Sequence, residues 1–513
     1  MVASKFLLAI SFCTLISLSS CSNVSPRSTN PLQATPAKQT PETVQAAQQL
    51  ASAQQAIKTK DWPAALAELR SIVDARTFRR LPVDLQYQTL SLTSRVTIYH
   101  GPKELGYAYL QRVIAMPQAG FVDWYEQLRF AVVTANIPVQ AQALTRLLQQ
   151  WPDRTVKLES DGIRQVLTST ANLPSGDYLT LLKALFDAHW KAKWDVEPSA
   201  TWRDLTLLLL SSGRFAEANE VTHHITDVYV LIDMRSDRRY DAVVEANASQ
   251  FDIVAAADRE LRTAQAAVDT YPKSLAVRTR LIETLINQLH YEAALATADA
   301  ALVDIRSTNF PNRVFDDLED ELPLFLNFRS VALERVGRWD EAVEQLTAAS
   351  RLHEKYSGNV DELINLGALY ADLGRPKDAL KAIDDVLAQT SHYGAMQLEA
   401  VRLDAAYQLG DTKQVARSLK FLEANRADAP SNYVSALVAV DQTDRAASAL
   451  IAELRDPQQR RGALLSVQDF ASPPETPRQL AFNAAMNSVV ARTAVQEAIR
   501  RVGRVDHYNL ESP

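Results

Sequence analysis

The histidines are the first residues that suggest chemistry, because imidazole is a common metal ligand and general base. The chain has eight of them, and only His223 and His224 are neighbours in the sequence. On a helix two adjacent side chains point about 100° apart, so this pair cannot share a metal as histidines four residues apart do. No HExxH motif occurs, and the remaining histidines are isolated. We therefore expect no metal site and no cofactor.

The acidic side chains form no recognisable catalytic or cation-binding motif. Residues 316–321 (DDLEDE) lack the alternating ligands and the central glycine of a calcium loop. Asp384 and Asp385 are adjacent on a predicted helix, and we expect them on its surface. The sequence contains no GxSxG, GxGxxG or GxxxxGK[ST] pattern. We predict a solvated loop at the acidic run and no catalytic residues.

Both cysteines lie near the N-terminus. Cys13 is inside an apolar run that follows Lys5, and residues 1–20 have the order of a secretion signal peptide. The Leu-Ser-Ser-Cys junction that ends at Cys21 resembles the bacterial lipobox, which implies that Cys21 is lipidated and begins the mature protein. An ordinary cleaved signal is the alternative. Since Cys21 is then the one cysteine of the mature chain, we expect no intramolecular disulfide and no cysteine nucleophile.

The resemblance also implies a location. The residue after Cys21 is Ser22 rather than an aspartate, which resembles the outer-membrane sorting pattern of Gram-negative lipoproteins. Residues 21–42 are rich in Ser, Pro, Thr and Gln, so we expect a flexible tether between the lipid and the body. The predicted protein is lipid-anchored in the bacterial outer membrane and faces the periplasm.

The composition favours a helical body. The chain has 513 residues but only 14 glycines, whereas strand-rich and phosphate-binding α/β folds need glycine in their turns. Ala, Leu, Gln, Glu and Arg dominate the patterned stretches, as helices prefer. The net charge of −7 is small for this length and dispersed, so nothing indicates nucleic-acid binding.

Residues 360–389 show how such a body is built. Apolar residues at helical spacing run from Leu363 to Leu373, and Asn359 precedes them as a predicted helix cap. Gly374 can end this first helix, and Pro376 can start the next one. A pair of helices this short buries little by itself, so we expect neighbouring pairs stacked against it.

Similar segments recur along the chain, each with a small residue that lets the second helix approach the first. The aligned small residues are Ala65, Ala218, Ala294, Ala342 and Ala379. Together with Leu366, Gly367 and Tyr370, this pattern resembles the tetratricopeptide repeat family, whose unit has about 34 residues. The resemblance implies an all-α, right-handed superhelical solenoid of helix–turn–helix repeats over residues 43–470. Residues 307–323 interrupt the spacing, and we predict that they form a loop.

The C-terminal part, residues 471–513, follows a proline-rich break (SPPETP). We predict one capping helix over residues 478–502, with Arg492, Arg500, Arg501 and Arg504 on its solvated side, because a solenoid needs a polar terminal element. Residues 507–513 show no periodicity. Trp62, Trp202 and Trp339 are predicted to pack between helices rather than to bind a ligand.

In the tetratricopeptide family the first helix of each pair lines a concave groove that binds proteins. Carrying those positions over gives a set of mostly acidic or amide residues, and the Lys/Asn clamp for a C-terminal carboxylate is absent. The set consists of Glu283, Asn287, Asn327, Glu334, Arg335, Asp361, Asp372, Asp404, Tyr407 and Gln408. A basic or neutral partner segment is therefore favoured; the alternative is that these residues are simply solvated helix faces.

These features predict a non-catalytic scaffold that binds other envelope proteins or peptide segments through its concave surface. Its membrane contact is predicted to be the lipid on Cys21, and no nucleic acid is expected. Two alternatives stay open. One is a component of an exopolysaccharide or envelope export machine, and the other is a cell-wall enzyme or enzyme activator.

Overall fold

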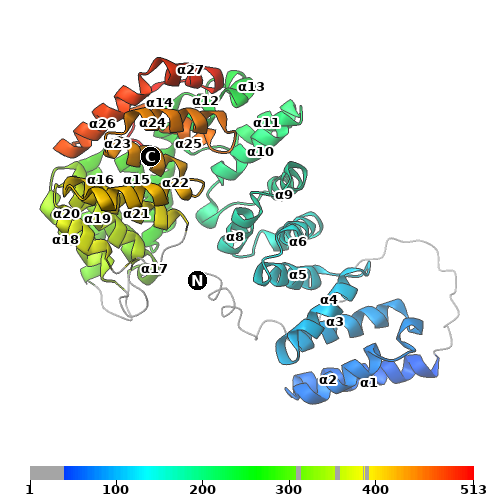
Figure 1. Cartoon of the computed structure of the whole chain (residues 1–513). Coiled ribbons are helices and arrows are strands. Elements are labelled where there is room, and N and C mark those ends of the chain that lie inside the picture. Colours follow the sequence, from blue (N-terminus) through cyan, green and yellow to red (C-terminus); the bar gives the residue numbers. More distant parts are fainter. Residues whose placement is uncertain (1–39, 308–313, 353–358, 385, 387–391) are drawn as a thin grey trace. The chain divides into compact units, whose positions relative to one another are not determined.

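The computed structural model describes residues 40–307, 314–352, 359–384, 386 and 392–513 (Figure 1). Cys21, the signal peptide and residues 21–39 of the predicted tether lie outside this part. The chain divides into two compact units, Met1–Lys193 and Trp194–Pro513. In the described residues both units consist almost wholly of helices, so the all-α solenoid of tetratricopeptide-like helix pairs is confirmed.

The first unit stacks helices as pairs joined by short turns, with α1 on α2, α3 on α4 and α5 on α6. Its elements are α1 (Pro41–Lys58), α2 (Trp62–Val73), η3 (Phe78–Arg80), α3 (Val83–His100), α4 (Lys103–Ile114), α5 (Phe121–Val133), α6 (Ile137–Gln150), α7 (Pro152–Thr155), α8 (Ser160–Thr170) and α9 (Ser175–Asp187). The helix α1 begins two residues inside the predicted tether, because Thr40 caps it and Pro41 occupies its first turn.

The second unit starts with a short hairpin and irregular helices. These are α10 (Ser199–Ser211), α11 (Phe215–Thr222), α12 (Val228–Ser236), η5 (Arg238–Tyr240), α13 (Asp241–Ala246) and α14 (Ile253–Thr270). The turn η4 (Lys193–Asp195) lies at the boundary in the sequence between the two units.

Regular helix pairs follow, and then the C-terminal elements. The pairs are α15 (Leu275–Asn287) with α16 (Tyr291–Ser307), α17 (Leu318–Arg335) with α18 (Trp339–Ser350), α19 (Val360–Asp372) with α20 (Pro376–Ile383), α21 (Tyr393–Gln408) with α22 (Thr412–Ala424), and α23 (Pro430–Ala439) with α24 (Thr443–Arg455). The remaining elements are α25 (Arg460–Leu465), β1 (Asp469–Phe470), α26 (Pro477–Val490), α27 (Thr493–Val502) and β2 (His507–Tyr508).

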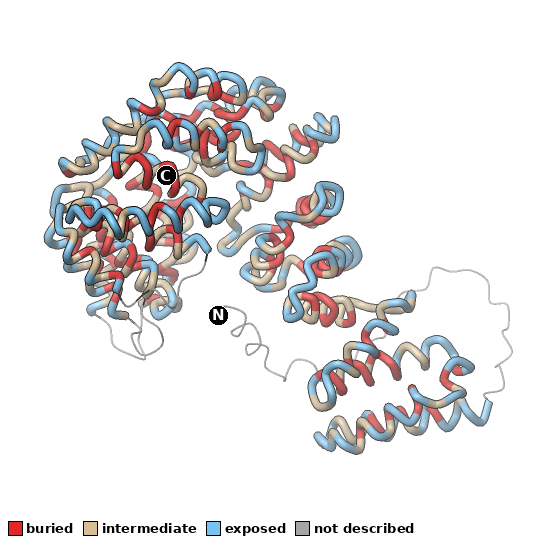
Figure 2. The backbone as a smooth tube through the Cα atoms, viewed as in Figure 1, coloured by how far each residue is buried: buried red, intermediate tan, exposed pale blue. Residues whose placement is uncertain are grey.

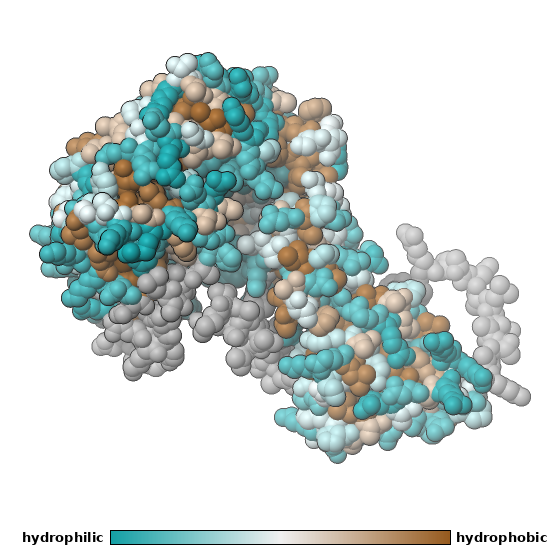
Figure 3. All heavy atoms as spheres, viewed as in Figure 1, coloured by the Kyte–Doolittle hydropathy of each residue, from teal (hydrophilic) through white to brown (hydrophobic). Residues whose placement is uncertain are grey.

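The repeat alignment is confirmed by burial. Each of the five aligned alanines has no exposed surface: Ala65, Ala218, Ala294, Ala342 and Ala379. Gly374 has φ of +67° at the turn between α19 and α20, a conformation that suits glycine. Red buried positions recur along the facing sides of the helices in Figure 2, and on the face drawn in Figure 3 hydrophobic residues form small patches among hydrophilic ones. Trp202 is buried, as predicted.

Two local predictions were wrong. The acidic run is not a solvated loop, because α17 begins at Leu318 and Asp317 accepts hydrogen bonds from Leu275 N at 2.7 Å and Ala276 N at 3.2 Å, which caps α15. The predicted single C-terminal helix is two helices, α26 and α27, broken at Ala491 and Arg492. Asp385 lies outside the described residues. No helix in the described part of the chain is long and apolar enough to cross a membrane.

Candidate functional site

Residues 503–511, which we call the C-terminal segment, contact the end of α12 and the start of α13, near the beginning of the second unit. The chain enters this segment through an antiparallel bridge between Gly503 and Asp237. Arg504 N donates to Ser236 O at 3.0 Å, and the Arg504 side chain forms an ion pair with Asp241. Helix α25 packs against α12, and both can be found in the upper part of Figure 1. The C-terminal part therefore does more than cover the last repeat, because it connects both ends of the second unit.

Glycine is required where the bridge forms. A Cβ atom at Gly503 would lie 2.3 Å from Ser236 O and 2.6 Å from the nearest methyl carbon of Leu464. The first contact is with backbone, which cannot rotate away as a side chain can. This close approach explains a glycine in an extended conformation, where φ alone does not demand one.

The segment continues as an added strand. β2 pairs in parallel with β1, so that Asp469 N donates to Asp506 O at 3.1 Å and Ala471 N donates to Tyr508 O at 3.1 Å. Asp506 N donates in turn to the side-chain oxygen of Gln468 at 3.0 Å. Hydrogen bonds of this kind hold a peptide by its main chain, whatever its sequence.

Alternate side chains of the segment face the protein. Arg235 Nε of α12 donates to Asp506 Oδ2 at 2.9 Å. Tyr508 and Leu510 are buried, and the Tyr508 ring lies 5.6 Å from that of Phe470, centre to centre. His507 and Asn509, between them, are exposed. The alternation is that of an extended strand with one face buried.

Glu511 ends the segment in a buried position, 5% exposed. Its amide donates to Asn287 O at 2.9 Å, and its carbonyl oxygen accepts from Tyr229 Oη at 2.6 Å. Arg335 Nε donates to its Oε1 at 2.6 Å. Groups from α12, α15 and α17 therefore converge on one residue. Burial, with the Glu511 charge second, raises the pKa of nearby Tyr291.

A second contact lies at the start of α26. Arg478 Nε donates to Asp404 Oδ2 at 3.0 Å, and Gln479 Nε2 donates to Asp372 Oδ2 at 2.8 Å. Gln479 is held in place because its Oε1 accepts from Thr476 N at 2.9 Å in a capping box. Burial raises the pKa of Asp372 despite the Gln479 hydrogen bond.

The structure brings together part of the predicted groove set. Asn287 and Arg335 contact the C-terminal segment, and Asp372 and Asp404 contact α26. Two more residues adjoin these contacts, since Gln408 Nε2 donates to Asp404 Oδ2 at 3.1 Å and Glu334 lies next to Arg335, with 3.7 Å between Oε2 and Nη1.

Other members of the set make different contacts. Asn327 accepts from Asn365 Nδ2 at 3.1 Å, and Tyr407 Oη donates to Asp441 Oδ2 at 2.5 Å. Asp361 is exposed in the first turn of α19. Sequence reasoning did not find Tyr229, Arg235, Arg478, Gln479 and Glu511. Whether the set binds an external partner stays a prediction.

Several carboxyl groups in the second unit have perturbed ionisation. Burial raises the pKa of Glu334 to about 7 against the opposing charge of Arg335. Burial also raises the pKa of Glu260 to about 7, and it raises the pKa of Glu283. The negative charge of Asp227 raises both pKa values further. Among the described residues no three His, Cys, Asp or Glu side chains are grouped so as to hold a metal ion.

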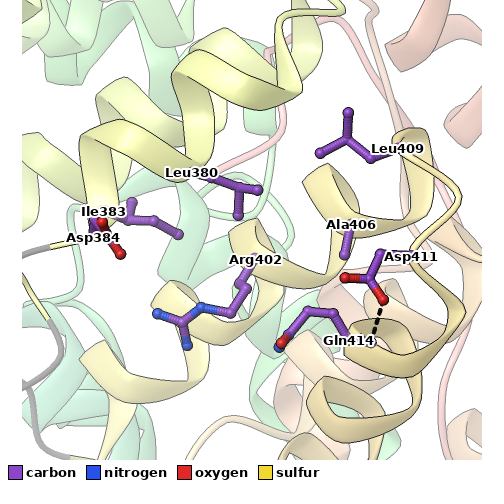
Figure 4. A pocket seen from close by; sticks show the side chains of 8 residues that line it. All are labelled: Leu380, Ile383, Asp384, Arg402, Ala406, Leu409, Asp411 and Gln414. Atoms are coloured by element: carbon purple, nitrogen blue, oxygen red, sulfur yellow. Dashed lines mark hydrogen bonds between the residues drawn. The ribbon is translucent and has the colours of Figure 1, made fainter.

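A small pocket lies between α20, α21 and α22 (Figure 4). Its volume is about 220 Å³, below the usual range for small-molecule sites. Asp411 and Gln414 on its rim are joined by the hydrogen bond from Gln414 N to Asp411 Oδ1, 2.9 Å long, which caps α22. These polar groups therefore serve the helix start.

No protein-family model and no curated protein matches the sequence. The apo form of RapI is 12% identical, over 89% of this chain and 98% of that chain, with a TM-score of 0.31. A Rap protein in complex with competence and sporulation factor is 12% identical, over 89% and 99%, with a TM-score of 0.29. The APC/C hetero-tetramer Cut9–Hcn1 is 11% identical, over 89% of this chain and 96% of that chain, with a TM-score of 0.29. Scores this low support no transfer of function.

Proposed function

We propose that this chain is a non-catalytic scaffold that binds other proteins of the bacterial envelope through the first helices of its repeats. The observation that supports the proposal is the capture of Glu511. Residues of three separate helices, Tyr229, Asn287 and Arg335, hold both the main chain and the side chain of one extended segment. A surface that holds its own segment in this way has the groups needed to hold an extended segment of a partner.

The scaffold is tethered by lipid on Cys21 and faces the periplasm from the outer membrane. This part of the proposal is supported by the signal-like residues 1–20 and by Ser22. Lipid chains contribute about 0.8 kcal/mol per buried methylene, and more than one chain gives stable attachment.

Crosslinking in intact cells tests the scaffold directly. A photoreactive amino acid placed at exposed Asp361, on the first helix of its pair, should capture a small set of discrete envelope proteins. The same group at exposed Lys381, on the second helix of that pair, is the matched control and should capture fewer. Equal capture at both positions, or none at either, would count against binding through the first helices.

Exchange of the signal tests the anchor. With residues 1–21 replaced by an ordinary cleavable secretion signal, the protein should appear in the soluble periplasmic fraction. A body that still sediments with membranes after a high-salt wash contradicts the lipid as the main attachment.

A cell-wall enzyme is the alternative that one observation favours. Burial, together with the charge of Asp227, raises the pKa of Glu260 and of Glu283, and perturbed carboxyl groups occur often at catalytic sites. If this alternative holds, the purified protein should degrade peptidoglycan in a gel assay, and a Glu260→Gln variant should not.

A further inference from the structure

The C-terminal segment has the anatomy of a bound peptide. Its main chain adds a strand to β1, and its alternate side chains Asp506, Tyr508 and Leu510 face the protein. Strand addition of this type divides the work, because main-chain hydrogen bonds supply affinity while pockets for alternate side chains supply specificity. Asn509 is exposed, and exposed His507 lies with its Nδ1 2.9 Å from Asp469 Oδ2 of β1.

The contacts at the two ends of this stretch are charge-specific. Arg235 donates to Asp506 at one end, and Arg335 donates to Glu511 at the other. Hydrogen bonds between guanidinium and carboxylate are among the stronger ones in proteins. The pattern that the site reads is therefore Asp-x-Tyr-x-Leu-Glu in an extended conformation.

Tyr291 is a further neighbour of Glu511. Burial raises the pKa of its hydroxyl, and the charge of Glu511 and a side-chain hydrogen bond with Glu511 act in the same direction. The strand pairing that holds the segment is short, because β1 and β2 have two residues each. The internal segment is therefore held by few main-chain hydrogen bonds, and an external segment can compete for them.

The geometry points to an exchangeable peptide site: β1, Arg235, Tyr229 and Arg335 bind residues 506–511 in cis, and an external protein segment with the same Asp-x-Tyr-x-Leu-Glu pattern displaces them. This inference rests on the proposed scaffold function and names its partner chemistry. The site is occupied and so inhibited by the chain itself until a competing segment arrives. The predicted preference here is for an acidic segment, in contrast to the basic or neutral partner that the sequence favours for the groove as a whole.

The test uses a fluorescent synthetic peptide with the sequence of residues 503–513 and the full mature chain. Wild-type protein should bind the peptide weakly, because its own segment fills the site and reduces the competent fraction. The Glu511→Gln protein, whose segment keeps its shape but loses its charge, should bind the wild-type peptide about tenfold or more tightly than the wild-type protein does. Adding Arg335→Gln to that protein should remove the gain.

Matched peptides serve as controls. Replacing the glutamate of the peptide by glutamine should weaken binding about tenfold or more, whereas alanine at the position of Asn509 should leave binding within about twofold. Circular dichroism and thermal melts show that each protein variant is folded. If folded Glu511→Gln protein does not bind the peptide, or if Arg335→Gln makes no difference, the inference is overturned. This outcome would leave the proposed scaffold function untouched, because partners captured by crosslinking at Asp361 do not depend on exchange of the C-terminal segment.

Discussion

Arg335 and Glu511 are 176 positions apart in the sequence, yet Arg335 Nε lies 2.6 Å from Glu511 Oε1. Their side chains are 18% and 7% exposed. The pair joins the middle of the helical repeats to the end of the chain. Closure of the second unit by its own C-terminal segment therefore depends on an ion pair that is largely withdrawn from water.

Loss of one partner should be costly. Removing the cation by Arg335→Gln leaves the Glu511 carboxylate buried without its counter-charge, so we expect the free energy of unfolding of the second unit to fall by about 3–5 kcal/mol. Urea denaturation measures this change. The matched control is Arg338→Gln, because Arg338 pairs with Glu341 at the surface and its loss should hardly move the midpoint. Equal effects would mean that the Arg335 pair is exposed in solution.

Two glycines should respond oppositely to alanine. Gly503→Ala should destabilise the protein, because its Cβ would clash with Ser236 O, whereas the space beside Gly176 in α9 is open to 4 Å. Gly176→Ala should be neutral or stabilise by up to about 1 kcal/mol through helix propensity. Thermal melts of the two variants compare them. A Gly503→Ala protein as stable as the wild type would show that the bridge to Asp237 does not form.

The acidic residues on the first helices of the repeats should differ in how much charge reversal destabilises the protein. From the sequence, charge reversal at Asp361, Asp372 and Asp404 together is expected to weaken partner capture without unfolding the protein. The structure changes this expectation for Asp404, because reversal breaks its hydrogen bond with Arg478 and should cost about 1.5–3 kcal/mol. Asp361→Lys, at an exposed site, should stay within about 0.5 kcal/mol. Denaturant midpoints that agree for the two variants would contradict the contact between α26 and α21.

Stability should depend on pH through the buried carboxyl groups. Burial raises the pKa of Glu260, Glu334 and Glu453 to about 7 in the folded state, from an ordinary value of 4.5. Between these values the folded chain binds more protons than the unfolded chain, so their contribution to stability is full below about pH 4.5 and is lost as the pH rises through about 7.

Glutamine at these three positions removes that dependence. Thermal melts between pH 5 and 8 should show a wild-type midpoint that falls with pH more steeply than that of the triple glutamine variant. A wild-type midpoint that rises more steeply than the variant's over this range would mean that the three carboxyl groups are ionised and paired in the folded protein.

The sequence predicted the elements whose signals are local. Ala379, Gly374 and Pro376 lie within one helix pair, and their roles follow from spacing and turn chemistry alone. Family positions also indicated Asn287 and Arg335 as site residues, because both lie on first helices. The sequence did not indicate that both residues contact Glu511.

The missed features depend on contacts between distant segments. Residues 507–513 have no periodicity, so nothing in them indicates that Tyr508 and Leu510 are buried or that Glu511 meets Arg335. Asp317 was missed for a related reason, since its partners Leu275 and Ala276 lie in another repeat. A local pattern reports the face of a helix, whereas these contacts arise only when the repeats stack.

The central claim is that the C-terminal segment is bound to earlier elements of the second unit. Hydrogen exchange of the segment tests this claim most directly. The amides of Arg504, Asp506 and Glu511 donate to Ser236 O, Gln468 Oε1 and Asn287 O. In wild-type protein, peptides that cover residues 503–511 should exchange far more slowly than the free synthetic segment, and Arg335→Gln should speed this exchange while the first unit stays unchanged. Exchange of residues 503–511 in the wild-type protein as fast as in the free peptide would contradict the account.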